Sequence, residues 1–378
     1  MAGETGSIAA MLLAELEVEH LSETYLGELC WENHNHLLRI PVLDAIIGKA
    51  LNTMPIPVEM DIDERPPLAN STRFGTVIEI SSVHTSAGKT HLLYYITAMC
   101  VLPETSCSIQ LHGRSSSIII IDNDGRFDVS RLFTIMLSHV LSCYKESGLD
   151  IPDSGAEAVV KDSLQHVHLF RPQNLAEVVK VLQGLPDYYT SPRYGTLDRS
   201  LGGILIDSLS AFYWPEKLAN SVSEGSDTGS HETYETMVRL IRGLSDRFGT
   251  FTIATTWGLH LVDETHQAPT TFGHATKSST ETPVFYPYFP SVWNRLVDVK
   301  LVVARNVKPR FSRNTSISEA FQEIRLHNKA SARYAFKGWI DIRGLSPAAQ
   351  EYFSTNEGTF RFNIMPDGIE LEEQSLDL

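Results

Sequence analysis

Ala87-Gly88-Lys89-Thr90 is the segment of this sequence with the most specific chemistry. In a phosphate-binding loop, backbone N–H groups at a helix start receive phosphate oxygens, a lysine reaches the β- and γ-phosphates, and a Ser or Thr hydroxyl ligates magnesium. The full pattern is G-x-x-x-x-G-K-[ST], and Val83 stands where its first glycine belongs. Valine resists positive φ, so we expect the loop to be strained or to take a slightly different path. Gly-Lys-Thr alone is a weak signal, and an ordinary surface turn is its alternative interpretation. We predict a nucleotide site at Ser86, Ala87, Gly88, Lys89 and Thr90.

A second candidate is the aspartate that ends an apolar stretch at residues 201–214, LGGILIDSLSAFYW. A carboxylate at the tip of a buried strand beside a phosphate-binding loop can hold magnesium through water. Alone, such an aspartate is more often a turn or a helix cap. Taken with Lys89, it favours a Walker B role, so we predict that Thr90 and Asp207 hold Mg²⁺ together with the nucleotide.

The third candidate is the sequence IDNDG at residues 121–125. Its Asp124 would polarise the water that attacks the γ-phosphate, as a general base does. A plain Asp-Gly turn explains the same residues equally well.

The elements that must position these residues alternate along the chain from Gly75 onward. Strands are predicted at 75–80, 116–121, 166–170, 203–207 and 250–256, and helices at 90–102, 129–147, 175–182 and 232–248. Asp128 is a predicted N-cap, and Asn174 with Glu177 resembles a capping box. Strands interleaved with helices indicate parallel pairing with helices on both faces, which is an α/β fold.

The two ends of the chain differ from this pattern. The tail has short β-like segments at 298–304, 323–327, 360–364 and 369–372 without intervening helices, which predicts an antiparallel extension. Residues 1–70 contain an apolar stripe typical of a short helix over 8–16, a possible helix over 37–51 and an acidic, Pro-containing linker over 55–67. We therefore divide the chain into an N-terminal segment, 1–70, and a core, 71–378. A low-complexity stretch, 221–230, is predicted to be a loop.

Composition limits the partners. The chain carries 31 Lys and Arg against 46 Asp and Glu, a net charge of −15. Proteins that grip nucleic acid through many phosphates usually have a basic face, so any DNA contact must be local, weak or shared with a partner. The four cysteines lack paired metal-ligand spacing and suit a reducing compartment, and no apolar run is long enough to predict a membrane span.

Three stretches, in this order and spacing, resemble the core of the RecA-like recombinases, and within that family its eukaryotic paralogue branch. They are residues 87–103 (AGKTHLLYYITAMCVLP), 118–132 (IIIIDNDGRFDVSRL) and 205–214 (LIDSLSAFYW). The resemblance implies a RecA-like P-loop NTPase core with a mostly parallel sheet, helices on both faces and an antiparallel C-terminal extension. It also implies ATP and Mg as ligands and membership of a paralogue complex.

That complex would assist the main recombinase on single-stranded or branched DNA during homologous-recombination repair of double-strand breaks in the nucleus. In this family an N-terminal segment commonly contacts a neighbouring subunit. The resemblance therefore makes Met11, Leu12, Leu13 and Leu16 candidates for docking to a partner.

Two departures from the family concern hydrolysis. Asp124 stands where the recombinases have a catalytic glutamate, and its side chain is one methylene shorter, which moves the base about an ångström from the water. Trp257 stands where they have a glutamine that senses the γ-phosphate, and an indole has only one donor. We expect at most a weak DNA-dependent ATPase.

The loops expected to face DNA, 215–232 and 258–291, contain one lysine each, Lys217 and Lys277. The best candidates for a residual DNA contact are instead Arg305, Lys308, Arg310 and Arg313. The alternative function is an active phosphotransferase or ATPase of another P-loop class. Such kinases supply arginines from a mobile lid, whereas this basic patch follows a predicted strand.

Overall fold

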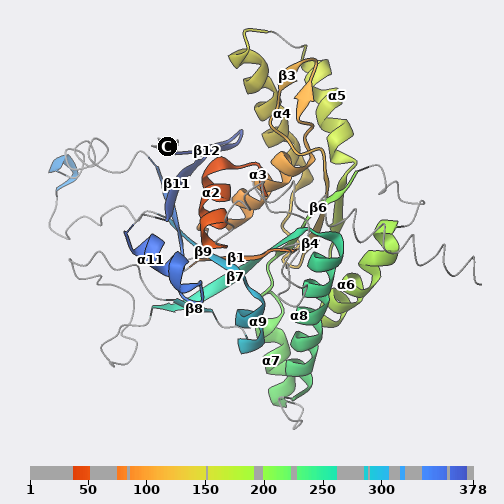
Figure 1. Ribbon diagram of the computed structural model, residues 1–378, viewed down its shortest axis with the longest axis vertical. Coiled ribbons are helices and arrows are strands. Elements are labelled where there is room, and N and C mark those ends of the chain that lie inside the picture. The colour runs from red at the N-terminus through yellow and green to blue at the C-terminus, as the bar shows by residue number, and fades with distance from the viewer. Residues whose placement is uncertain are drawn as a thin grey trace, which may run out of the picture.

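A ten-stranded sheet lies at the centre of the part of the chain that the structure describes (Figure 1). The computed structural model describes residues 37–51, 75–82, 86–149, 152–190, 199–222, 228–261, 285–287, 290–305, 316–319, 334–355 and 358–372. The strand order is β12-β11-β10-β9-β1-β7-β6-β4-β5, and β8 (Phe285–Pro287) pairs with the end of β7.

The middle of this sheet is parallel, as the alternation of strands and helices predicts. It comprises β1 (Val77–Ser82), β4 (Ser117–Asp122), β5 (Val167–Phe170), β6 (Leu201–Asp207), β7 (Phe251–Leu261) and β9 (Val299–Arg305). Every residue of β1, β4 and β6 is buried. Burial on both faces explains why these strands are nearly continuous apolar runs in the sequence.

Helices cover both faces (Figure 1). Because successive strand residues point to opposite faces, β1 sends Ile78 and Ile80 to one core and Val77 to the other. The first core holds α2 (Pro41–Ala50), α3 (Lys89–Val101), α4 (Val129–Glu146) and α5 (Asp153–Leu164). The second holds α6 (Leu175–Thr190), α8 (Thr228–Phe248) and α9 (Ser291–Leu296).

Both predicted helix starts are confirmed. The Asp128 carboxylate accepts the backbone N–H of Ser130 at 2.8 Å, and Asn174 Oδ1 accepts that of Glu177 at 2.9 Å. The helix predicted over 175–182 is α6, and its predicted end is wrong, because α6 continues through Pro186 to Thr190. The apolar spacing that sets a helix face does not reveal where the helix ends.

The antiparallel C-terminal extension is also confirmed. Strands β10 (Phe336–Ile340), β11 (Thr359–Ile364) and β12 (Ile369–Leu371) follow β9 with antiparallel pairing. The expectation of no intervening helix is wrong, since α11 (Pro347–Thr355) lies between β10 and β11. The predicted strand at 323–327 lies outside the described residues.

The N-terminal part contributes to the core through the helix expected over 37–51. This helix is α2, which packs against β11. The apolar side chains of α2 belong to the same core as those of α3. The division of the chain at residue 70 stays a prediction. The helix predicted over 8–16 and the linker predicted over 55–67 lie outside the described residues.

The loops expected near DNA contain more regular structure than the sequence indicated. Helix α7 (Tyr213–Val222) and the start of α8 occupy most of 215–232 and both ends of the low-complexity stretch 221–230. Those loop predictions are therefore wrong at their ends. Strand β7 continues into 258–291 as far as Leu261. Among the described helices, none combines the length and apolar character of a bilayer-crossing segment.

Candidate nucleotide-binding site

The turn between β1 and α3 has the backbone of a phosphate-binding loop. Gly88 precedes α3 with φ of 92°, in the left-handed region, and no side chain caps the first turn of the helix. A Cβ atom on Gly88 would lie 3.0 Å from the Phe362 ring and 3.2 Å from Ile364 of β11. Glycine is thus required twice, for its positive φ and for the close approach of β11. Val83, at the first position of the motif, lies outside the described residues.

Lys89 is held at the start of α3 by the end of β1. Its Nζ donates to Ser82 Oγ at 2.5 Å. Burial lowers the pKa of Lys89 from the ordinary 10.5, and the negative charges of Asp207 and Asp124 act in the opposite direction. The ammonium group is thus partly desolvated and faces carboxylates, as expected of a cation that awaits further negative charge.

Asp207 lies beside the same helix turn, so the predicted convergence is present. Thr90 Oγ1 donates to Asp207 Oδ2 at 2.7 Å, and Thr255 Oγ1 from β7 donates to Oδ1. Asp207 is 5% exposed. Strands β1, β6 and β7 are parallel, so their carboxyl ends meet at one edge, where open α/β sheets bind ligands.

Asp124 lies at the same edge, beyond the end of β4. Its backbone N–H donates to the Asp207 carbonyl oxygen at 3.2 Å, and Ser208 Oγ donates to its Oδ1 at 3.5 Å. Burial and the nearby charge of Asp207 raise the pKa of Asp124. A raised pKa makes a carboxylate a better proton acceptor, which suits the predicted general-base role.

The loop that carries Asp124 is shaped by a residue that the motif reading missed. The buried Asp122 carboxylate accepts the backbone N–H groups of Arg126 and Phe127, each at 3.0 Å, and the guanidinium of Arg171 at 3.1 Å. Arg171 also donates to the Phe127 carbonyl oxygen at 2.6 Å. Asp122 therefore fixes the geometry of this loop. The sequence signal for it was the presence of a second aspartate in the motif, two residues before Asp124.

The donor set fits magnesium with a nucleotide. Mg²⁺ usually takes one or two carboxylates and completes its shell with water and phosphate oxygens. Thr90 and Asp207 supply one hydroxyl and one carboxylate, already in contact with each other. Within the described ranges, no three His, Cys, Asp or Glu residues gather where they could bind a metal by themselves. Such a site would depend on phosphate oxygens from the ligand.

Two curated relatives match somewhat less than two thirds of the chain. The chain is 24% identical over 274 residues to the DNA repair protein XRCC2 homolog of Arabidopsis thaliana, covering 64% of this chain and 72% of that protein. It is 26% identical over 233 residues to the DNA repair protein XRCC2 of Mus musculus, covering 61% and 73%. The chain is thus similar in sequence to XRCC2 DNA repair proteins of a plant and a mammal. No protein-family model matches it. The crystal structure of the RadB recombinase matches with a TM-score of 0.43 and 14% identity, over 79% of this chain and 91% of that one.

Trp257 lies one residue beyond Thr255 and Thr256 of β7. Its backbone N–H donates to Ser210 Oγ at 3.1 Å, and its side chain is 40% exposed. It pairs in register with Ser82, the partner of Lys89, so it lies at the same edge of the sheet as the candidate nucleotide residues.

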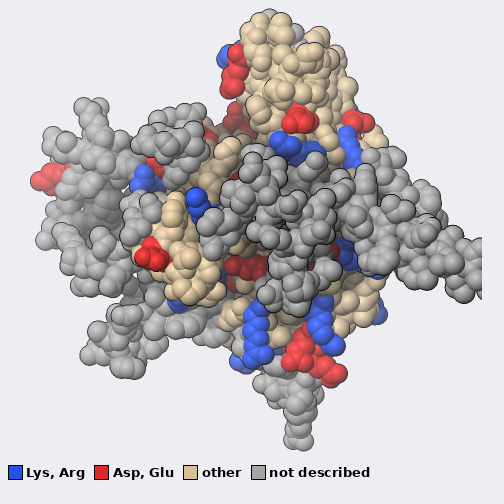
Figure 2. Space-filling view, viewed as in Figure 1, with Lys and Arg blue, Asp and Glu red and all other residues tan. Residues whose placement is uncertain are grey.

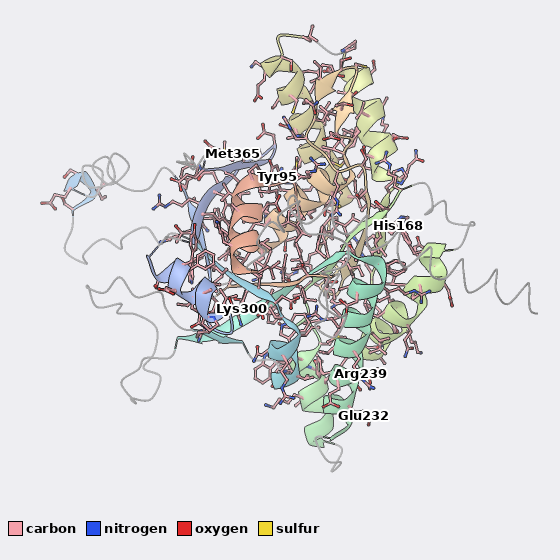
Figure 3. All side chains as sticks on the ribbon, in the orientation of Figure 1. Tyr95, His168, Glu232, Arg239, Lys300 and Met365 are labelled. Carbon is pink, nitrogen blue, oxygen red and sulfur yellow. The ribbon has the colours of Figure 1, made fainter. Side chains whose placement is uncertain are left out.

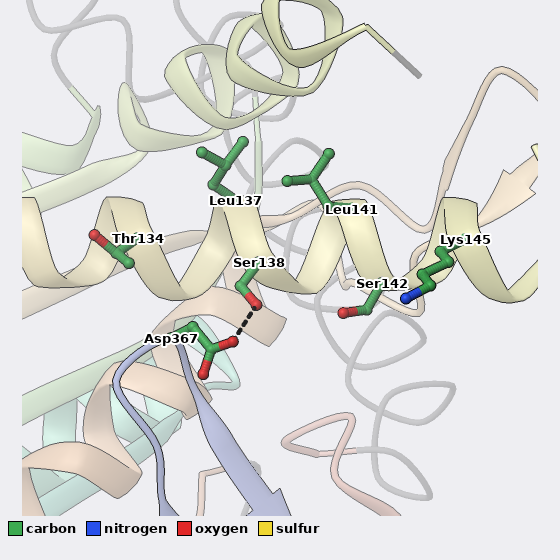
Figure 4. Close-up of a pocket in the computed structure, with 7 residues that line it drawn as sticks. All are labelled: Thr134, Leu137, Ser138, Leu141, Ser142, Lys145 and Asp367. Atoms are coloured by element: carbon green, nitrogen blue, oxygen red, sulfur yellow. Dashed lines mark hydrogen bonds between the residues drawn. The ribbon is translucent and has the colours of Figure 1, made fainter. Parts of the chain in front are cut away.

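The remaining candidate residues lie away from this edge or outside the described ranges. Arg305 is exposed at the end of β9, with its guanidinium over the Phe336 ring at 6.0 Å from the centroid. Lys308, Arg310 and Arg313 are not among the described residues, and neither are Met11, Leu12, Leu13 and Leu16. A shallow groove of about 360 Å³ lies along α4, where Ser138 faces Asp367, and none of the predicted site residues lines it (Figure 4).

Nucleotide affinity is expected to fall as the pH rises toward 10.5. In the protein without nucleotide, burial lowers the pKa of Lys89, and the charge of a bound phosphate would raise that pKa again. When the pH lies above the pKa of Lys89 in the nucleotide-free protein, binding must therefore be accompanied by uptake of a proton. Calorimetric titrations in two buffers of different ionisation enthalpy would measure that uptake. The Lys89→Ala variant should show none, and a wild-type protein that took up no proton at alkaline pH would contradict the assignment.

Proposed function

We propose that this chain is an ATP- and Mg²⁺-binding mediator or assembly subunit of a recombinase-paralogue complex. It would act in the nucleus in homologous-recombination repair of DNA double-strand breaks. Its partners would be other RecA-like paralogues and the main recombinase. The observation that carries the nucleotide part is the meeting of Lys89, Thr90 and Asp207 at one sheet edge. The relatives named for DNA repair support the remainder.

The chain's own residues would divide the binding of ATP among them. Backbone N–H groups of residues 86–90 and the start of α3 would receive phosphate oxygens. Lys89 would give up Ser82 for the phosphates, and Thr90 and Asp207 would hold the metal. Bound magnesium would supply charge neutralisation at the phosphates.

Hydrolysis would be slow because both residues that act on the attacking water differ from those of the active recombinases. Asp124 is shorter than glutamate, and its carboxylate is engaged by Ser208. Trp257 offers no acceptor for a water or a phosphate relay. Binding of ATP without rapid turnover suits a subunit whose nucleotide stabilises an assembly.

Direct DNA binding would be weak and would use the basic patch Arg305, Lys308, Arg310 and Arg313. Figure 2 shows acidic and basic side chains interspersed on the described part of one face, rather than a continuous basic area. A face of mixed charge makes few simultaneous phosphate contacts. Single-stranded or branched DNA would therefore be held mainly through the complex.

The test begins with the purified full-length chain, Mg²⁺ and labelled ATP. We expect stoichiometric binding with little hydrolysis, whether or not single-stranded DNA is present. The Asp124→Glu substitution restores the longer base, so we expect it to raise the hydrolysis rate while binding is kept. Rapid DNA-stimulated turnover by the wild type would contradict a mediator role, and failure to bind ATP would refute the nucleotide site.

The complex is tested separately, by affinity purification from the native source. Recovery of other RecA-like paralogues is the expected result. Replacing Met11, Leu12, Leu13 and Leu16 by serine should release a partner if the N-terminal segment docks to it. Retention of every partner by that variant would exclude this docking mode.

A further inference from the structure

Glu79 is a carboxylate buried at the centre of the sheet, in β1, with 0% of its surface exposed. Three donors surround it. Thr256 Oγ1 donates to Oε1, Trp293 Nε1 donates to Oε2 at 3.1 Å, and Lys300 Nζ lies 3.3 Å from Oε1. Buried ion pairs are weak evidence for stability, because the cost of desolvation offsets much of their attraction. A set of donors this complete therefore suggests a positional role as well.

The position of Glu79 relative to the nucleotide edge follows from two adjacent threonines of β7. Neighbouring strand residues point to opposite faces. Thr255 donates to Asp207 on the face covered by α3, and Thr256 donates to Glu79 on the face covered by α9. The candidate metal-binding carboxylate and the buried carboxylate are thus joined through consecutive residues of a single strand.

Glu79 also binds one residue of β7 and one residue of α9, two elements that are far apart in the sequence. Thr256 precedes residues 257–292 and Trp293 follows them, and the two donate to different oxygens of the same carboxylate. Trp293 is 0% exposed. Lys300 pairs with Glu79 in register across β1 and β9, and Figure 3 labels it near the middle of the sheet. One buried group therefore joins β7, α9 and β9.

We propose that Glu79 is a positioning residue that couples the nucleotide edge to α9 through Thr255, Thr256 and Trp293. This inference rests on the proposed nucleotide function. Asp207 accepts hydrogen bonds from both Thr90 and Thr255, so binding at its carboxylate changes the bond to Thr255. Thr256 follows directly, and its hydroxyl transmits the change to Glu79 and so to the indole N–H of Trp293.

The test observes the indole N–H of Trp293 by nuclear magnetic resonance in the full-length, ¹⁵N-tryptophan-labelled chain. The signal is assigned with Trp293→Phe, and the probe is Mg²⁺ with a non-hydrolysable ATP analogue. The wild-type signal is expected to shift when the analogue binds. Thr256→Val should abolish the shift while the affinity stays within about threefold, since Thr256 does not touch the binding residues. Thr256→Ser, which keeps the hydroxyl, should restore the shift.

Thr252→Val is the matched control, because it also removes a buried hydroxyl from β7. The Thr252 hydroxyl bonds to Ser245 and not to the Asp207 or Glu79 carboxylate. It should keep both the affinity and the shift. Analogue binding by the wild type with an unmoved Trp293 signal would overturn the inference and leave the proposed function intact. A full shift in Thr256→Val would overturn it as well. Failure of the wild type to bind the analogue would overturn the proposed function, and this inference with it.

Discussion

Replacing Lys89 with alanine is expected to weaken ATP binding roughly 100-fold, since hydrogen bonds to charged groups contribute about 1.5–3 kcal/mol and this one lies in a desolvated site. The ammonium group also faces Asp207 and Asp124, whose charges would repel the phosphates without it. Equilibrium binding of a fluorescent ATP analogue in the presence of Mg²⁺ measures the loss.

The controls for Lys89→Ala separate charge from fold. Lys180→Ala removes an exposed lysine from α6 and should leave affinity unchanged. Lys89→Arg keeps the positive charge but replaces a compact ammonium with a planar group, and so should bind less tightly than wild type. Thermal unfolding of Lys89→Ala should resemble wild type, which would attribute lost binding to the site itself. Undiminished affinity in Lys89→Ala would mean that the nucleotide lies elsewhere.

The sequence contained enough to predict which of the candidate nucleotide residues meet, because each lies at or beyond the carboxyl end of a buried strand. Asp207 ends β6, Asp124 lies two residues beyond β4, and Lys89 opens the helix that follows β1. Parallel pairing of these strands was expected, and parallel strands place their carboxyl ends together. Their hydrogen-bond partners were not predictable in this way. Ser82 and Thr255 contribute single hydroxyls from within buried strands, where Ser and Thr usually serve only as small core residues.

The fold was predictable where periodicity was strong and failed where the tertiary context decides. Helix α3 and strand β4 were predicted to within one residue at each end, and strand β6 to within two. By contrast, α7 covers the start of 215–232, which the family resemblance predicts to be a loop, and reaches into the low-complexity stretch 221–230. Glu79 was overlooked for a related reason, because a single acidic residue in an apolar strand carries no sign of the donors that approach it from distant elements.

Replacing Asp298 with alanine is expected to lower the free energy of unfolding by about 1–3 kcal/mol, because the Val77 N–H and the partly buried Arg242 guanidinium lose their acceptor. The Asp298 side chain is 8% exposed and lies just before β9, where its carboxylate accepts the Val77 backbone N–H at 2.8 Å and both ends of the Arg242 guanidinium at 3.1 Å. Arg242 also donates to the carbonyl oxygens of Gly75 and Leu296. This ion pair joins the starts of β1 and β9 to α8 and the end of α9, so its loss would loosen all four. Chemical denaturation of the full-length chain measures the effect.

The matched control is Asp162→Ala, which breaks an ion pair of the same length, 3.1 Å to Arg199, at a carboxylate that is 66% exposed. Exposed pairs contribute less than about 1 kcal/mol, so this variant should unfold almost as the wild type does. Asp298→Asn keeps the shape and can still accept the Val77 N–H, and should fall between the two. If Asp298→Ala and Asp162→Ala lowered the free energy of unfolding equally, the lower exposure of the Asp298 carboxylate would not explain how much its ion pair contributes to stability. The stability of the β1 and β9 starts would then have to come from the surrounding apolar packing alone.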